Sequence, residues 1–410
     1  MKNAPPAREA KPRLRVYPYW WPPSLVLRQA GSALAIGILT RWRRMPQWFF
    51  RYGFKCLPGA AGSHGMGCIG FPDHPVWEMT TVCNLKCIHC HTAGGEPGAA
   101  ELTTDQGKRM LDGLSRVKNF RMMAFTGGEP LMRPDLFELL AYARALGFAN
   151  TIATNATLIN DNAARRLRDH GVVIAAVSLD GFTAQTHDMV RGLAGSFDAA
   201  VKGMRALGRA GILLHVNITA MEYNVDQLNE LVNLVGDLDT GILLIYQLVP
   251  VGRGRAIQDA VLSREANERL ANFMARAQRR TNAIMEPVAG PQYWPLLLKR
   301  VHIANGLPLY LAEKIFHGCS AGRGFVYIKP DGEVWPCPFI EMSCGNVRER
   351  PFAEIWSESP VLEQLRRRET LLKGQCGSCL YRRLCGGCRG RALAMTGDLM
   401  AEDPCCFIHD

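Results

Sequence analysis

The sequence predicts an α/β fold of parallel strands and helices, followed by a cysteine-rich C-terminal region. From Val76 to about Pro250, short apolar runs alternate six times with amphipathic stretches. This alternation is typical of β/α units joined by right-handed crossovers. The most distinctive motifs of this region follow predicted strands. Because the active sites of α/β folds lie at the carboxyl ends of strands, we expect the functional site at that end.

The individual elements follow from apolar spacing and from capping signals. Thr103 and Thr104 offer a helix N-cap, with Asp105 in the first turn. Residues 251–316 are expected to be a helical connector, because Ser263 to Arg280 is amphipathic and charged. The expected strands are 76–82, 121–126, 150–154, 173–179, 212–218 and 242–248, and the expected helices are 103–117, 135–146, 161–169, 195–209 and 225–236.

Three cysteines follow the first predicted strand, in the run Cys83-Asn-Leu-Lys-Cys87-Ile-His-Cys90. Three thiolates on one tight loop can hold three corners of a [4Fe–4S] cluster. The next cysteine along the chain is Cys319, so one iron would stay open to an exogenous ligand. The alternative for the triplet alone is a zinc knuckle or chance clustering.

A glycine-rich turn follows the second predicted strand, in Thr126-Gly-Gly-Glu-Pro130. Two glycines let the backbone approach a ligand closely, and a proline stops the strand. Alone, this motif indicates only a turn. Its position one helix after the cysteine loop favours a joint role with the three thiols.

Together the two motifs resemble those of the radical S-adenosylmethionine (SAM) enzymes. The resemblance implies a partial (β/α)6 TIM-like barrel in which Cys83, Cys87 and Cys90 hold the catalytic cluster. In that family the open iron takes the amino and carboxylate groups of SAM. One electron from the cluster then splits SAM into methionine and a 5′-deoxyadenosyl radical.

Further strand ends match the family more loosely. Thr154-Asn-Ala-Thr-Leu158 resembles its Thr-Asn-Gly turn, with Ala156 in place of glycine. Ser178 and Arg191 are candidates for holding the carboxylate or ribose of SAM, since a guanidinium pairs a carboxylate in bidentate fashion. The alternative interpretation is that Ser178 lies in an ordinary turn at the end of a strand and that Arg191 is a surface arginine. The cofactor-binding residues that the resemblance implies are His89, Gly127, Gly128, Glu129, Pro130, Asn155, Ser178, Asp180 and Arg191.

The C-terminal cysteines resemble the SPASM extension, which carries two auxiliary [4Fe–4S] clusters. Tyr327 to Val334 is expected to be a hairpin with a Pro-Asp-Gly turn. Zinc is the alternative, although paired zinc ligands are generally separated by more than the five residues found here. The resemblance assigns Cys319, Cys337 and Cys388, with Cys344 as a further candidate, to an inner cluster, and Cys376, Cys379 and Cys385, with Cys405 or Cys406, to an outer one.

The N-terminal residues differ from the rest in charge. Of the formal net charge of +11, residues 1–55 carry +10, from eleven Lys/Arg and one acid, so the remainder carries +1. The apolar run from Ala30 to Thr40 is too short to span a bilayer. Aromatic and basic residues around it fit either a membrane surface or a helix packed on the body. No nucleic-acid partner is expected, and the clustered cysteines fit a reducing cytoplasm, with contact at the inner face of the membrane left open.

We therefore expect a basic extension (1–70), a radical SAM barrel (71–250), the helical connector (251–316) and a SPASM domain (317–410). The expected function is an oxidoreductase that cleaves SAM and abstracts hydrogen from a substrate, with a reductant such as ferredoxin or flavodoxin. Cys385-Gly-Gly-Cys-Arg-Gly-Arg-Ala392 looks most like enzymes of alternative haem synthesis, which act on tetrapyrrole propionates. The alternatives are a peptide maturase and a non-catalytic iron–sulfur electron carrier.

Overall fold

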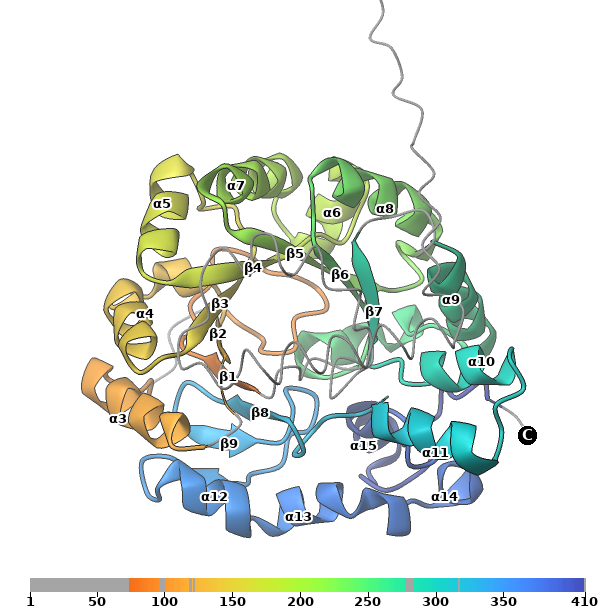
Figure 1. Ribbon diagram of the computed structural model, residues 1–410. Helices are drawn as coiled ribbons and strands as arrows, with labels where there is room; N and C mark the ends of the chain where they lie inside the picture. The colour runs from red at the N-terminus through yellow and green to blue at the C-terminus, as the bar shows by residue number, and fades with distance from the viewer. Residues whose placement is uncertain are drawn as a thin grey trace, which may run out of the picture.

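A curved sheet of ten strands forms the centre of the molecule, with helices around its outer side (Figure 1). The computed structural model describes residues 74–95, 100–117, 120, 122–277, 283–315 and 318–408. The expected N-terminal extension, with its membrane-surface alternative, lies outside these residues. The strand order is β10-β9-β8-β1-β2-β3-β4-β5-β6-β7, with β1 to β8 parallel and the last two antiparallel to their neighbours.

The elements alternate along the chain as β/α units. The strands are β1 (His74–Glu78), β2 (Met122–Thr126), β3 (Ala149–Thr154), β4 (Val172–Ser178), β5 (Leu213–Ala220), β6 (Ile242–Gln247), β7 (Ile284–Val288), β8 (Phe325–Ile328), β9 (Glu333–Trp335) and β10 (Gly345–Asn346). The helices are α3 (Thr104–Ser115), α4 (Leu136–Ala145), α5 (Asp161–Asp169), α6 (Ala184–Arg191), α7 (Ser196–Ala210), α8 (Leu228–Asp237), α9 (Arg264–Ala277), α10 (Tyr293–Lys299), α11 (Gly306–Ile315), α12 (Phe352–Glu358), α13 (Pro360–Arg366), α14 (Gly374–Ser378) and α15 (Arg389–Thr396).

The partial barrel predicted from the sequence is confirmed, and all six expected strands are present. β4 shows why they form, since six of its seven residues are buried, as is typical of parallel strands covered on both faces. Thr103 caps α3 as expected, because its hydroxyl accepts a hydrogen bond from the backbone N–H of Gln106. The short helix α6 was not expected, although it carries Arg191.

The segment 251–316 differs from the expected helical connector. It contains α9, α10 and α11, but it also contains β7, which pairs with β6 and extends the parallel sheet. β7 carries Pro287 and the buried Glu286, so no apolar alternation marks it as a strand. Proline is tolerated there because β7 is the edge strand of the sheet.

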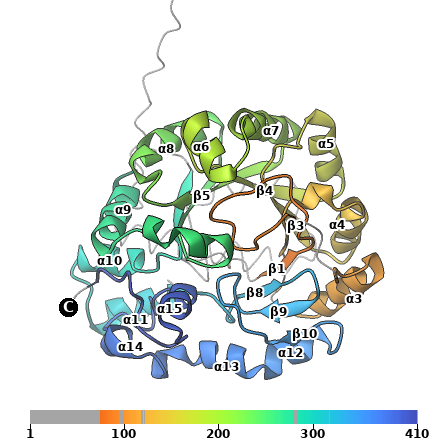
Figure 2. The same ribbon diagram turned by 180° about the vertical axis from the view of Figure 1, so that it is seen from behind.

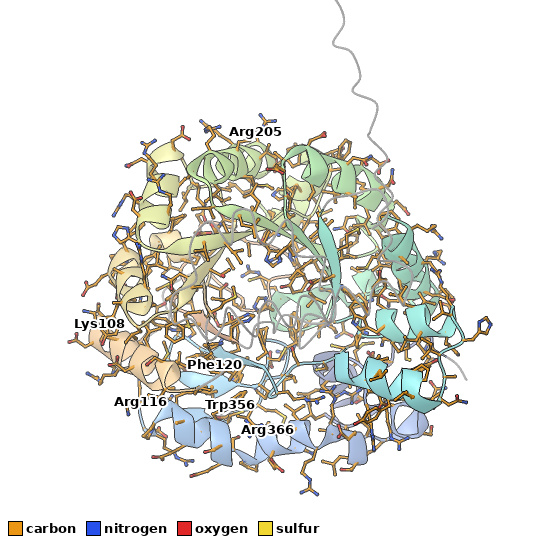
Figure 3. The ribbon with its side chains drawn as sticks, in the orientation of Figure 1. Lys108, Arg116, Phe120, Arg205, Trp356 and Arg366 are labelled. Carbon is orange, nitrogen blue, oxygen red and sulfur yellow. The ribbon has the colours of Figure 1, made fainter. Side chains whose placement is uncertain are left out.

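The C-terminal region continues the barrel sheet. β8 pairs in parallel with β1, and β8 and β9 form the expected hairpin, with Gly332 at a φ of 89° in its turn. Both views place α12 and α13 beneath this hairpin, outside the barrel (Figure 2). At the junction, the rings of Phe120 and Trp356 lie 5.4 Å apart, and the guanidinium of Arg366 lies 4.6 Å from the Trp356 ring (Figure 3). Among the described helices, none combines the length and apolarity needed to cross a bilayer.

Candidate active site and auxiliary cysteine sites

A cavity of about 290 Å³ lies inside the barrel, and the three cysteines of the first loop line it. Cys83, Cys87 and Cys90 are all free thiols on the segment that follows β1. The cavity also reaches residues on the inner faces of the barrel strands, so the thiols and the barrel interior share one space. This arrangement lets a group held at the cysteine loop meet a molecule bound in the barrel.

The cysteine loop is held in place by Arg253, which follows β6, and by the end of α6. Arg253 donates from Nε to the carbonyl of Cys87 (2.8 Å) and from Nη1 to that of Gly94 (2.7 Å), and its backbone N–H reaches the carbonyl of Cys90 (2.9 Å). At the C-terminal end of α6, the carbonyl groups of Arg191 and Val190 accept hydrogen bonds from the N–H groups of Lys86 and Ile88 in the cysteine loop. These hydrogen bonds fix the shape of the loop that carries the three thiols.

The surroundings of the thiols in this loop fit an iron–sulfur cluster. Burial raises the pKa of the Cys83 thiol to about 11, so a bound cation must stabilise the thiolate. The N–H of Leu85 points at Cys83 Sγ (3.4 Å), and Arg191 Nη1 lies 3.8 Å from Cys87 Sγ. Such donors suit sulfur ligands that carry negative charge.

The two glycines of the second motif let its turn pack against the base of the cysteine loop. A Cβ on Gly127 would lie 2.7 Å from the carbonyl oxygen of Thr80, and one on Gly128 would lie 2.3 Å from that of Val82. The N–H of Gly128 donates to the Thr80 carbonyl at 2.7 Å. Both glycines also line the cavity. Their lack of a side chain therefore lets the turn pack against the cysteine loop and leaves its backbone exposed to a ligand in the cavity.

Glu129 and Pro130 support the motif from behind. The Glu129 carboxyl is fully buried and accepts hydrogen bonds from the Thr154 hydroxyl (2.8 Å) and the N–H of Asn155 (2.9 Å). Burial raises its pKa to about 7. Pro130 is buried at the start of a 3-10 turn. The pair ties the end of β2 to the end of β3, while Asn155 itself lines the cavity.

Asp180 and Arg191 form a buried ion pair beside the cysteine loop. Arg191 Nη2 lies 2.5 Å from Asp180 Oδ2, and Asp180 Oδ1 accepts from the N–H of Thr219 at 2.7 Å. Burial acts to raise the pKa of Asp180, but the charge of Arg191 and the hydrogen bond from the N–H of Thr219 help to bring it below its ordinary value. Burial also lowers the pKa of His89 to about 4, so this ring is neutral. Ser178, His89 and Arg191 all line the cavity.

Four C-terminal cysteines form one electrostatic group. Burial, followed by the nearby thiols of Cys406, Cys376 and Cys379, raises the pKa of Cys385. Burial, with Cys376 and Cys379 again as contributors, raises that of Cys406 to about 12. Cys405 is influenced by Arg391, Asp403 and Arg264 rather than by other cysteines. The structure therefore brings Cys406, rather than its neighbour, to the outer set.

Three of the cysteines that are expected to hold the inner cluster are linked by charge or by packing. Burial is the main cause that raises the pKa of Cys388 to about 12, and Cys319 is a further contributor. Cys337 packs against the apolar cluster that contains Cys319. Cys344 lies apart, in the main core beside Ser359 and Arg366, where burial raises its pKa to about 11. The sequence offered no signal for this separation, because Cys344 follows Cys337 by only seven positions.

Buried arginines surround the two sets. Arg368 and Arg389 are both fully buried, and no ion pair joins either to an acidic side chain among the described residues. Arg389 Nη2 lies 3.7 Å from Cys376 Sγ, and Arg368 donates to the carbonyl of Cys319. A buried unpaired charge costs several kcal/mol. Anionic thiolate clusters at these positions would offset that cost, so the residues fit the auxiliary clusters.

Comparison with known proteins decides the family. Residues 77–235 match the radical SAM superfamily, and residues 319–380 match an iron–sulfur cluster-binding domain of the SPASM type. An AdoMet-dependent heme synthase of Oleidesulfovibrio alaskensis is 36% identical over 335 residues, which cover 80% of this chain and 86% of that protein. The chain belongs to the radical SAM superfamily. This radical SAM protein is a SAM-dependent enzyme whose cofactors are SAM, a [4Fe–4S] cluster that binds it and auxiliary [4Fe–4S] clusters.

Other relatives of this radical SAM protein bear two kinds of name. A pre-heme d1 synthase of Dinoroseobacter shibae is 35% identical (81% of this chain, 85% of that protein), and a mycofactocin maturase of Mycobacterium ulcerans is 33% identical (82% and 88%). Among solved structures, SuiB of Streptococcus suis bound to the precursor peptide SuiA has a TM-score of 0.66 at 20% identity, covering 83% of this chain and 77% of that one. The structural likeness supports the fold alone.

Proposed function

We propose that this enzyme removes hydrogen from a propionate side chain of a tetrapyrrole, in the synthesis of a haem-type cofactor. The observation that carries the chemistry is the single cavity shared by three thiols, the glycine turn and the barrel interior. The choice of a tetrapyrrole as the substrate is supported by the relatives, which include heme and pre-heme d1 synthases at 35 to 36% identity. A reductant of the ferredoxin or flavodoxin type would supply electrons.

The residues around the cavity have distinct roles in this proposal. Cys83, Cys87 and Cys90 hold three irons of the cluster and leave the fourth iron to SAM. The bound cluster and SAM together supply one electron and a 5′-deoxyadenosyl radical. Gly127, Gly128 and Asn155 line the cavity and would border the methionine end of SAM, while Ser178 and the neutral His89, which also line it, would border its nucleoside.

Charge around the site is balanced by the chain itself. Arg191 faces both Asp180 and Cys87, so its charge offsets that of the thiolates and stays available to the SAM carboxylate. The barrel walls exclude water, which protects a reactive radical from side reactions. At the C-terminal end, Cys319, Cys337 and Cys388 hold an inner auxiliary cluster, and Cys376, Cys379, Cys385 and Cys406 hold an outer one.

An anaerobic turnover assay tests this proposal. The cluster-loaded enzyme is mixed with SAM and dithionite, and 5′-deoxyadenosine is quantified with and without iron coproporphyrin III. We expect the yield of 5′-deoxyadenosine to rise with the porphyrin and the mass of the porphyrin to change, as mass spectrometry would show. A rate of 5′-deoxyadenosine formation that is the same with and without the porphyrin would contradict the proposal of a tetrapyrrole substrate.

A peptide substrate is the second candidate function. The mycofactocin maturase relative, at 33% identity, favours it. In that case a ribosomally made peptide, rather than the porphyrin, would raise the yield of 5′-deoxyadenosine in the same assay. No 5′-deoxyadenosine with intact clusters under either condition would favour a role as electron carrier.

A further inference from the structure

Three polar side chains inside the barrel have an atom without a hydrogen-bond partner among the described residues. These atoms are His215 Nε2 and Asn217 Oδ1 on β5, and Glu286 Oε1 on β7. All three side chains line the cavity, and Glu286 is only 3% exposed. Buried polar groups are normally paired, since leaving one unsatisfied costs about 1–3 kcal/mol. The barrel therefore keeps hydrogen-bonding capacity directed at its own cavity.

The strand register brings the three groups together. Asn217 pairs with Leu244 of β6, and Leu244 pairs with Glu286, so these side chains share one row of the barrel wall. Two strand spacings separate Asn217 from Glu286, or about 10 Å between backbones. His215 lies one row further from the cysteine loop. A small planar group between β5 and β7 can reach all three.

At neutral pH these groups are uncharged. Burial raises the pKa of Glu286 well above its ordinary value, and no neighbouring charge counters this. Burial, with His74 as a further contributor, lowers the pKa of His215 to about 3. Glu286 is thus an O–H donor, and Asn217 Oδ1 is an acceptor. A group that both accepts and donates matches this pair, and a carboxylic acid does both.

The polar row and the cysteine loop line one and the same cavity. Its volume of about 290 Å³ is at the small end of ligand pockets, which span about 300–1,000 Å³. Two small side chains, Ala153 and Ala176, line the cavity in the same row as His215 and leave space beside the polar groups. A carboxyl group held by the polar row would leave the methylene carbons of the same arm facing the cysteines.

We propose that His215, Asn217 and Glu286 form a subsite that binds the protonated carboxyl group of a substrate side arm. The proposal rests on the tetrapyrrole function above and identifies the groups that recognise the propionate. The subsite orients the arm, so its residues are positioning residues. It would also reject an arm whose carboxyl is blocked, because the acceptor Asn217 would then lack a donor.

Binding measurements with the full-length, cluster-loaded enzyme test the subsite. The probes are coproporphyrin III and its tetramethyl ester, and affinity is read from quenching of porphyrin fluorescence. We expect the wild type to bind the acid at least about tenfold more tightly than the ester. Glu286→Leu and His215→Leu should each lose about 5- to 100-fold in affinity for the acid, whereas Glu286→Gln, which keeps a donor, should stay within about threefold.

A matched control and the outcomes separate the two proposals. Glu268 is exposed on α9, and Glu268→Leu should bind the acid as the wild type does. Using two leucine variants guards against one that fails to fold, which melting by circular dichroism would reveal. If folded variants keep the wild-type affinity and the preference for the acid, the subsite is wrong and the tetrapyrrole function stands. If the wild type binds neither probe, both the subsite and the tetrapyrrole function are wrong.

Discussion

The barrel and the C-terminal region treat cysteine in different ways. The three barrel cysteines line a cavity, and the arginine that reaches one of their sulfur atoms, Arg191, is already paired with Asp180. No C-terminal cysteine lines that cavity, and the thiols there lie among arginines, of which Arg368 and Arg389 have no acidic partner among the described residues. In the barrel, His215, Asn217 and Glu286 direct unsatisfied polar atoms at the cavity, whereas in the C-terminal region the guanidinium of Arg389 lies beside the sulfur of Cys376.

This difference teaches how one chain separates two uses of iron–sulfur clusters. A cluster for chemistry needs an open iron and space beside it. A cluster for electron transfer needs burial and charges that set its potential. The barrel offers three thiols that line a cavity, while the outer C-terminal set offers four thiols that do not line it.

The largest expected effect comes from the barrel cysteines. Cys90→Ala should lower 5′-deoxyadenosine formation by about a thousandfold or more, because the cluster that holds SAM would be lost. Iron should fall to roughly eight per chain, the content of two auxiliary clusters. The matched control is Cys344→Ala, which should keep roughly twelve irons and full SAM cleavage, since Cys344 lies apart from the other thiols. Loss of four irons in that control would place Cys344 among the ligands.

The buried arginines should set the potential of the auxiliary clusters. Burial lowers the pKa of Arg368 to about 10, so it is still charged at neutral pH, and Cys319 and Cys385 are both near it. Arg368→Met should shift an auxiliary reduction potential by about 100 mV to more negative values, since a nearby positive charge favours the reduced state. Redox titration followed by electron paramagnetic resonance measures this. Arg366→Met, at the Trp356 ring, is the control, and equal shifts in both would contradict the assignment.

The buried Glu286 of the barrel should make the free energy of unfolding depend on pH. The pKa of Glu286 is raised in the folded protein above its ordinary value of 4.5, so folding favours the protonated form. Relative to Glu286→Gln, wild-type stability should be greatest below about pH 4.5 and should fall by about 1.4 kcal/mol per pH unit above it. Denaturant unfolding of both proteins between pH 4 and 7 measures the difference. A constant difference across this range would show that Glu286 is ionised in the fold.

The smallest effect concerns backbone strain. The C-terminal turns use glycine at positive φ, as at Gly386 (68°), whereas the barrel places Ala156 at 60°. A left-handed alanine costs about 1–2 kcal/mol, but this methyl group is fully buried. Ala156→Gly should therefore stabilise the protein by less than about 1 kcal/mol in thermal or denaturant unfolding. A loss above that size would show that packing of the methyl outweighs the strain.

Local sequence signals were enough for the six barrel strands, the cysteine loop and the hairpin at Gly332. They were not enough for features that depend on long-range pairing. β7 has a proline and a glutamate in five residues, so periodicity misses it, and only its pairing with β6 makes it a strand. Likewise, Cys405 and Cys406 are equivalent in spacing, and only the packing of the C-terminal loop separates them.

The measurement that tests the central claim most directly is hydrogen transfer from a labelled substrate. Iron coproporphyrin III carrying deuterium on its propionate methylenes would be turned over anaerobically with SAM and dithionite. We expect deuterium in the 5′-deoxyadenosine, because a propionate arm bound in the cavity would lie beside the cysteine loop. Formation of 5′-deoxyadenosine without deuterium, while the porphyrin is bound, would contradict the account.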